Sequence, residues 1–129
     1  MIVHFGGDAL NFKLDKEKAL CPQICEQLCL AILMGEYLPD EKILSVRETA
    51  LDFGINPNTV QRAYESLEEQ GILYSVRGSG WYVSEDTSIA KERIKNTVKE
   101  KTALYFLAMS ALGYSLEETK NYVKEWENE

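Results

Sequence analysis

The sequence has few of the side chains on which many enzymes depend. Among its 129 residues there is a single histidine, His4, and there are three cysteines, Cys21, Cys25 and Cys29. No nucleophile motif is present, and the glycines of "RGSG" are not followed by the lysine and helix of a P-loop. The sequence therefore predicts no catalytic residues, no enzyme activity and no cofactor.

Long apolar runs are also missing. No run approaches the ~18 apolar residues of a membrane-spanning helix, and the first residues lack the basic and apolar regions of a signal peptide. We therefore expect a cytoplasmic protein without a membrane partner. Because 45% of the residues are hydrophobic and 27% are charged, the chain has enough apolar side chains for a folded core.

The three cysteines cannot all pair within one chain, and their crowding is unlike a secreted disulfide framework. Their spacing of i, i+4 and i+8 places them along one stripe of a helix. Such a stripe could hold a soft metal or respond to oxidation, but no fourth ligand is evident near it. We favour small apolar residues packed in the core, predict no metal site, and keep a redox or metal sensor as an alternative.

Negative charge is unevenly distributed along the chain. The formal net charge is −7, which taken alone argues against a polyanionic partner. Two windows nevertheless contain no aspartate or glutamate, and they run from Phe53 to Tyr64 and from Gln70 to Ser84. These windows hold Arg62 and Arg77, so they mark where a phosphate backbone could approach.

Helix signals organise the first half of the chain. Apolar residues at helical spacing follow Pro22 until Gly35, and "EYLPDEKIL" then indicates a loop and a brief strand. The capping box "SVRE" opens a helix over 46–53 that ends at Gly54. Asn56 is the expected N-cap of the next helix, with Pro57 as its first residue and a stop at 71. Two short helices joined by so tight a turn predict a helix-turn-helix.

A β-hairpin and two further helices complete the expected order. The segments "ILYSV" and "WYVS" flank the glycine-containing turn "RGSG", as in a β-hairpin. Thr87 or Ser88 can cap a helix that Gly113 ends, and "SLEE" from Ser115 is a second capping box. The last helix is expected to turn Leu116, Thr119, Tyr122, Val123 and Trp126 inward. The predicted fold class is mainly α with a small β-hairpin: a winged helix-turn-helix followed by a two-helix C-terminal dimerisation tail.

A winged helix docks on DNA through the N-terminal end of its second helix. Backbone N–H groups at that end favour phosphate, which early acidic side chains would repel. Amide, hydroxyl and guanidinium groups there can contact base edges, and an arginine in a glycine turn can reach the minor groove. The residues that these properties predict to contact DNA are Arg47, Asn58, Thr59, Gln61, Arg62, Arg77, Gly78 and Gly80.

These motifs resemble those of a known family. The run "SVRETALDFGINPNTVQRAYESLEEQGILYSVRGSGWYV", with the preceding "AILMGEYLP", is similar to the winged-helix domain of the GntR family of bacterial transcription regulators. "NPNTVQRAY" is most similar to its short YtrA-like branch, and the resemblance covers about residues 14–84. It implies DNA contacts at the residues given above and, in addition, at Pro57. Asp40 departs from the pattern, since the family usually has glycine there, and we expect a looser backbone around it.

The resemblance also suggests how the rest of the chain is used. Residues 1–84 are predicted to form the DNA-binding domain, with 1–11 as an extension of unknown role, and residues 85–129 a helical hairpin for dimerisation. Only 45 residues follow position 84, which is too few for the effector domains of the longer branches. The residues expected to form the dimer interface are Ile94, Val98, Leu104, Leu107, Leu112, Tyr122 and Trp126.

We therefore expect a homodimeric DNA-binding transcriptional repressor that recognises a pseudo-palindromic double-stranded operator. By resemblance to the YtrA-like branch, its targets would include transporter genes. A small-molecule effector would have room only at the dimer interface or between the wing domain and the tail. The main alternative, which the net charge of −7 favours, is a winged-helix protein-interaction module that does not bind DNA.

Overall fold

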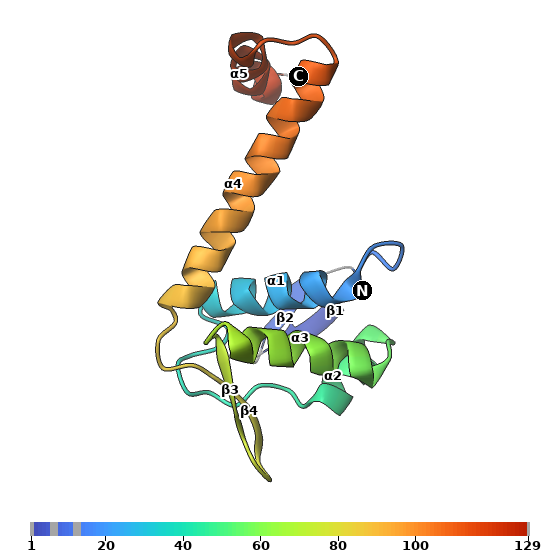
Figure 1. Ribbon diagram of the computed structural model, residues 1–129, viewed down its shortest axis with the longest axis vertical. Helices are drawn as coiled ribbons and strands as arrows, with labels where there is room; N and C mark the ends of the chain where they lie inside the picture. Colours follow the sequence, from blue (N-terminus) through green and yellow to red (C-terminus); the bar gives the residue numbers. More distant parts are fainter. Residues whose placement is uncertain (1, 6–7, 12–13, 129) are drawn as a thin grey trace. The chain divides into compact units, whose positions relative to one another are not determined.

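The computed structural model describes residues 2–5, 8–11 and 14–128, and it divides the chain into two compact units, Met1–Ile94 and Lys95–Glu129 (Figure 1). We call these the N-terminal unit and the C-terminal unit. The elements, in chain order, are β1 (Ile2–Phe5), β2 (Asp8–Asn11), α1 (Leu20–Leu33), α2 (Val46–Phe53), α3 (Pro57–Glu69), β3 (Leu73–Val76), β4 (Gly80–Val83), α4 (Ser88–Ala111), α5 (Leu116–Glu125) and the 3-10 helix η1 (Trp126–Asn128).

The winged helix-turn-helix in the N-terminal unit confirms the predicted fold class. α3 packs against both α1 and α2, and β3 pairs with β4 in an antiparallel hairpin that projects from the helices (Figure 1). Buried residues of α1 and α3 meet in one core, which includes Ile24, Leu28, Val60 and Leu67. This core fixes α3 in place because it lies along the inner face of that helix.

The turn between α2 and α3 has the backbone expected of it. Gly54 adopts φ 67° and ψ 41°, a left-handed conformation that glycine reaches without the steric cost of a Cβ. Its N–H bonds back to the end of α2, and the N–H of Ile55 donates to the carbonyl of Ala50 at 3.0 Å. Only Ile55 and Asn56 then separate the cap from α3, so the angle between the two helices is set by a very short connection.

The structure contains two strand pairings that the sequence patterns do not specify. β1 and β2 form an antiparallel pair in which Ile2 lies opposite Asn11 and Phe5 opposite Asp8. The brief strand expected near Ile43 is a single β-bridge between Lys42 and Tyr82, which adds a third segment beside the wing. None of the helices in the described part of the chain combines the length and apolarity that a membrane span requires.

The C-terminal unit contains the greater part of α4, then α5 and η1. The second capping box is present, because Ser115 Oγ accepts from the N–H of Glu118 at 3.1 Å while the Ser115 N–H donates to Glu118 Oε1 at 3.1 Å. Thr119 is buried, but Leu116, Tyr122 and Trp126 are exposed. The expectation that all of these side chains face inward is therefore wrong for the single chain.

Candidate nucleic-acid interface

The first turn of α3 is built as an anion-accepting helix terminus. Asn56 is its N-cap, and its Oδ1 accepts from the backbone N–H of Asn58 at 2.8 Å. Pro57 occupies the first helical position, where a missing N–H costs nothing. No acidic residue lies in this turn, so the partial positive charge of the helix N-terminus is not neutralised from within.

Side chains beyond the cap divide into two groups by exposure. Pro57, Asn58 and Arg62 are exposed, whereas Thr59 and Gln61 are half-buried. Gln61 also donates from Nε2 to Glu65 Oε1 at 2.8 Å, one turn further along the helix. The five residues predicted on α3 thus share one end of the helix, and Pro57, Asn58 and Arg62 are the exposed ones among them.

Arg47 lies in the first turn of α2, which is stabilised by the capping box predicted from "SVRE". Glu48 N donates to Ser45 Oγ at 3.1 Å, and Ser45 N donates to Glu48 Oε1 at 3.2 Å. The hydrogen bond from the Ser45 backbone holds the pKa of the Glu48 carboxyl below its usual range. Arg47 is exposed at the second helical position of this capped helix start.

A buried tyrosine holds α2 and α3 together behind these contacts. Tyr64 is fully buried, and its hydroxyl lies 2.7 Å from Thr49 Oγ1 and donates to the carbonyl of Leu44 at 2.9 Å. Burial raises the pKa of Tyr64 well above its usual range. The ring of Trp81 packs edge-on against it, with centroids 5.5 Å apart. Tyr64 thereby links the helix-turn-helix to the wing.

The wing presents Arg77 at the tip of its turn. Gly78 and Gly80 adopt φ values of 80° and 137°, in the left-handed region that favours glycine. Tyr74 and Tyr82 stack across the hairpin with centroids 5.4 Å apart. In the third residue of β3, the backbone N–H and the hydroxyl of Ser75 both donate to Glu68 Oε2, at 3.1 and 2.7 Å. The hairpin is therefore tied to the end of α3.

The structure adds one cation that the sequence does not single out. Lys42 is exposed beside the wing, and a Cβ added at Gly80 would lie 3.2 Å from its Cε. The signal that could have identified it is the brief strand at "KIL", which needs a pairing partner in the hairpin. Within the described part of the chain, no ion pair engages the side chains of Arg47, Arg62 or Arg77. These three guanidinium groups are therefore available to a partner.

The cysteine stripe lies inside the core. Cys25 and Cys29 are buried and Cys21 is half-buried, and Cys25 Sγ donates to the carbonyl of Ala63 at 3.5 Å. Burial raises the pKa of Cys25 to about 12, with a further contribution from Cys21, and that of Cys29 to about 11. Among the residues that the structure describes, no cluster of histidine, cysteine and carboxylate side chains is arranged to hold a metal ion.

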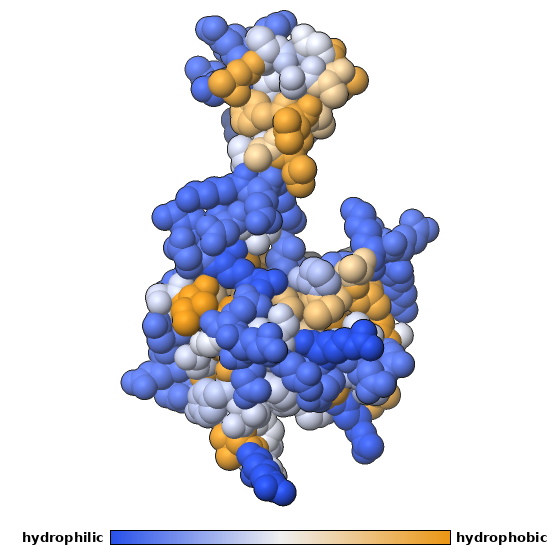
Figure 2. Space-filling model, viewed as in Figure 1, coloured by the Kyte–Doolittle hydropathy of each residue, from blue (hydrophilic) through white to orange (hydrophobic). Residues whose placement is uncertain are grey.

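Apolar side chains gather on the surface of the C-terminal unit, over the end of α4 and over α5 (Figure 2). Of the residues predicted for dimerisation, Ile94 differs from the rest, because it is half-buried against the core of the N-terminal unit. The other six are exposed, with exposed fractions of 59% for Val98, 65% for Leu104, 66% for Leu107, 74% for Leu112, 40% for Tyr122 and 66% for Trp126.

The chain is similar to known regulators over both units. The profile of a family described as "Bacterial regulatory proteins, gntR family" matches residues 20–83. The HTH-type transcriptional repressor YtrA of Bacillus subtilis is 36% identical over 104 residues, which cover 80% of this chain and 80% of that protein. A GntR family transcriptional regulator from Listeria monocytogenes is 38% identical, with a TM-score of 0.76 over 87% of this chain and 98% of that structure.

A solved structure of a DNA complex shows the same domain. It is the DNA-binding domain of AraR in complex with operator ORX1, which is 33% identical to this chain. The match has a TM-score of 0.50 and covers 58% of this chain and 92% of that structure.

Proposed function

This chain belongs to the GntR family of bacterial transcription regulators, and on that premise we propose that it is a homodimeric repressor of a pseudo-palindromic operator. Regulators of this family are not enzymes. The observation that carries the proposal is the N-terminal end of α3, where Asn58 and Arg62 are exposed on a capped, acid-free helix start. Such an end suits the major groove.

Each predicted contact has a distinct role in this proposal. Asn58 offers a bidentate amide for an adenine edge, with Thr59 and Gln61 beside it, and Arg62 suits guanine or phosphate. Arg47 lies where α2 would cross the backbone. Arg77 enters the minor groove from the wing, and Gly78 and Gly80 let the hairpin backbone come close to the DNA. The relative named YtrA is a repressor, and the AraR domain is bound to an operator, which supports the same use of this surface.

Dimerisation through the C-terminal unit would supply the second half-site. The exposed apolar side chains of α4 and α5 form a surface that would be unfavourable in water, and a second copy of the chain would cover it. A twofold axis places two copies of α3 about one helical turn of DNA apart, which requires a pseudo-palindrome. Occlusion of a promoter is then the simplest mechanism of repression, and transporter genes are the proposed targets by similarity to the YtrA-like branch.

A protein-interaction module without DNA binding remains the alternative favoured by the net charge of −7. The two functions are separated by selecting bound duplexes from a random pool with the full-length chain. The repressor function requires an enriched palindrome and an affinity that falls steeply with salt. An unenriched pool, or binding insensitive to salt, would favour the interaction module.

Variants then test the surface itself. Asn58→Ala is expected to cost about 1–3 kcal/mol and to relax specificity at one position of the half-site. Arg77→Ala and Arg62→Ala should also weaken operator binding, whereas Lys91→Ala, an exposed lysine on α4, should not. If the Lys91 variant weakened binding as much as the Arg62 variant, general charge rather than this surface would be responsible.

The dimer is tested by light scattering at micromolar concentration. Leu107→Glu and Leu112→Glu place charge on the exposed face of the C-terminal unit and should yield monomers. Met34→Glu is the matched control, because Met34 is also exposed, at 63%, but lies in the N-terminal unit. A wild-type chain that is monomeric at this concentration would exclude the proposed dimer.

A further inference from the structure

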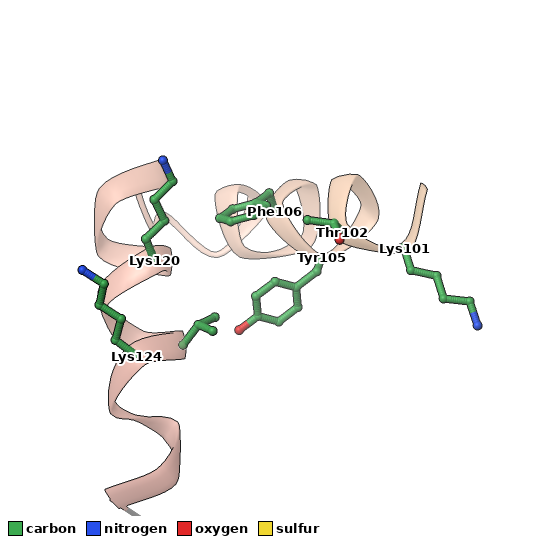
Figure 3. Close-up of a pocket in the computed structure, with 7 residues that line it drawn as sticks. Lys101, Thr102, Tyr105, Phe106, Lys120 and Lys124 are labelled. Carbon is green, nitrogen blue, oxygen red and sulfur yellow. The ribbon is translucent and has the colours of Figure 1, made fainter. Parts of the chain in front are cut away.

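The open groove between α4 and α5 belongs to the surface proposed to meet a second copy of the chain. Figure 3 shows Tyr105 and Phe106 extending from α4 toward α5, and Val123 on α5 lines the same groove. Because this surface would be covered in the dimer, it would not contact base pairs. Discrimination between DNA sequences is therefore left to the N-terminal unit.

The exposed face of α3 carries acidic as well as DNA-reading side chains. Asn58, Arg62, Glu65 and Glu69 follow one another at intervals of four, three and four residues, so they share one face of the helix. All four are exposed. Glu65 thus lies on the face that would enter the major groove, and a carboxylate close to phosphates is unfavourable unless a donor satisfies it.

The donor for Glu65 is Gln61, whose Nε2 lies 2.8 Å from Glu65 Oε1. A carboxylate can only accept hydrogen bonds, so the atom that faces it must be the amide nitrogen of Gln61. If the amide turned over, Gln61 Oε1 would face Glu65 Oε1 with no proton between the two acceptors. Glu65 therefore fixes which end of the Gln61 amide remains for another partner.

The groups of Gln61 that remain are one N–H and the carbonyl oxygen Oε1. In the major groove, adenine presents an acceptor at N7 and a donor at N6, which match this pair. Guanine presents two acceptors, N7 and O6, so Oε1 of the fixed amide would face a second acceptor. A glutamine that could turn freely would avoid this by donating both amide hydrogens to guanine.

We propose that Glu65 is a positioning residue that makes Gln61 accept adenine and reject guanine, an inference that rests on the proposed DNA binding. In the free chain Glu65 is exposed, so the bond contributes little to stability. In the major groove the bases displace water, and an acceptor that faces another acceptor stays unsatisfied. Glu65 should therefore affect base preference rather than folding.

The test starts from the palindrome that the wild-type chain selects. Selection with Gln61→Ala identifies the base pair that Gln61 contacts, because the preference there is lost. At that position the wild type should bind adenine at least about tenfold more tightly than guanine. Glu65→Ala should reduce this ratio to about threefold or less without weakening binding of the guanine duplex. Because both affinities are measured on one sample, partial unfolding does not change their ratio.

Matched variants separate positioning from charge. Glu69→Ala removes the same charge from the same face but leaves the bond between Gln61 and Glu65, so it should change both affinities equally and preserve the ratio. Glu65→Gln keeps the length of the side chain, but the new amide can donate as well as accept. Gln61 could then turn over, and the ratio should fall toward that of Glu65→Ala.

Several results would overturn the inference and leave the repressor function standing. They are a selected palindrome that Gln61→Ala does not alter, a wild-type preference for guanine at the Gln61 position, and an unchanged ratio in Glu65→Ala. Equal falls of the ratio in Glu65→Ala and Glu69→Ala would assign the effect to charge. If Glu65→Ala still changes the ratio when Gln61 is alanine, Glu65 contacts the base itself. A pool without any palindrome would overturn the proposed function and this inference together.

Discussion

The hydroxyl of Tyr64 on α3 lies 2.7 Å from Oγ1 of Thr49 on α2, and both side chains are fully buried. The same hydroxyl donates to the carbonyl of Leu44, which is half-buried, so the relative position of the two helices depends on hydrogen bonds made by the buried Tyr64 hydroxyl. A buried polar atom that loses its partner incurs its full desolvation penalty. This relationship makes the geometry of the helix-turn-helix sensitive to single atoms.

Tyr64→Phe is expected to lower the free energy of unfolding by about 1–3 kcal/mol, because the Thr49 hydroxyl and the Leu44 carbonyl lose a partner. Urea denaturation measures this loss. In the double variant with Thr49→Val, one of the stranded groups is also removed. The double variant should therefore be less destabilised than the sum of the two single variants, and strict additivity would show that the hydroxyls are not coupled.

Ser45→Ala should lower the free energy of unfolding by about 0.5–2 kcal/mol, because α2 loses its N-cap, whereas Ser45→Gly should cost only a few tenths. The wild type should also lose stability in acid. The pKa of Glu48 is depressed in the folded chain, so its contribution is present above the ordinary value of 4.5 and is lost as the pH falls through the lower folded pKa. The contribution of the Glu48 carboxylate to the free energy of unfolding is measured by comparing acid titrations of the wild type and Glu48→Gln.

Asp40→Ala is expected to destabilise the chain by about 1 kcal/mol, because alanine at a left-handed position is strained and cannot hydrogen-bond locally. Asp40 has φ 62°, its N–H donates to the Val83 carbonyl at 2.9 Å, and its Oδ1 accepts from the Tyr74 hydroxyl at 3.0 Å. These bonds anchor the residue where we expected a looser backbone. Asp40→Gly should be more stable than Asp40→Ala in thermal denaturation, and equal stabilities would contradict a left-handed backbone here.

Cys25 and Cys29 should not react with Ellman's reagent at pH 8 in the native protein and should react fully in guanidinium chloride. Their pKa values are raised by burial, so the stabilising contribution of the protonated thiols is complete below the ordinary value of 9.0. It is lost as the pH rises from there toward about 11 and 12. Performing the titration on Cys21→Ser removes the half-buried thiol from the signal. Rapid reaction of this variant with Ellman's reagent in the native state would support the alternative of a redox sensor.

Local signals account for the parts of the fold that could be predicted. The capping boxes at Ser45 and Ser115, the left-handed Gly54 and the cap at Asn56 are each decided within a few residues, and the structure confirms them. The bridge between Lys42 and Tyr82 joins residues far apart in the chain, so the local strand pattern at "KIL" does not show which segment it pairs with.

The C-terminal unit was harder to predict for a different reason. An apolar stripe shows that a helix has something to bury, but it does not show whether the partner is the same chain or another molecule. The stripe on the last helix predicts inward positions for Tyr122 and Trp126, but both side chains are exposed in the single chain. The DNA-contacting and dimer residues stay predictions until the variants are measured.

The segregation of charge has a consequence for how such a repressor would search a chromosome. Acidic residues outnumber lysine and arginine by 21 to 14, yet none lies in the windows that carry Arg62 and Arg77. Affinity for arbitrary DNA comes almost entirely from phosphate neutralisation, which the net charge of −7 opposes. The chain would thus spend little time on the very large excess of wrong sequences, and few molecules per cell would suffice to keep an operator filled.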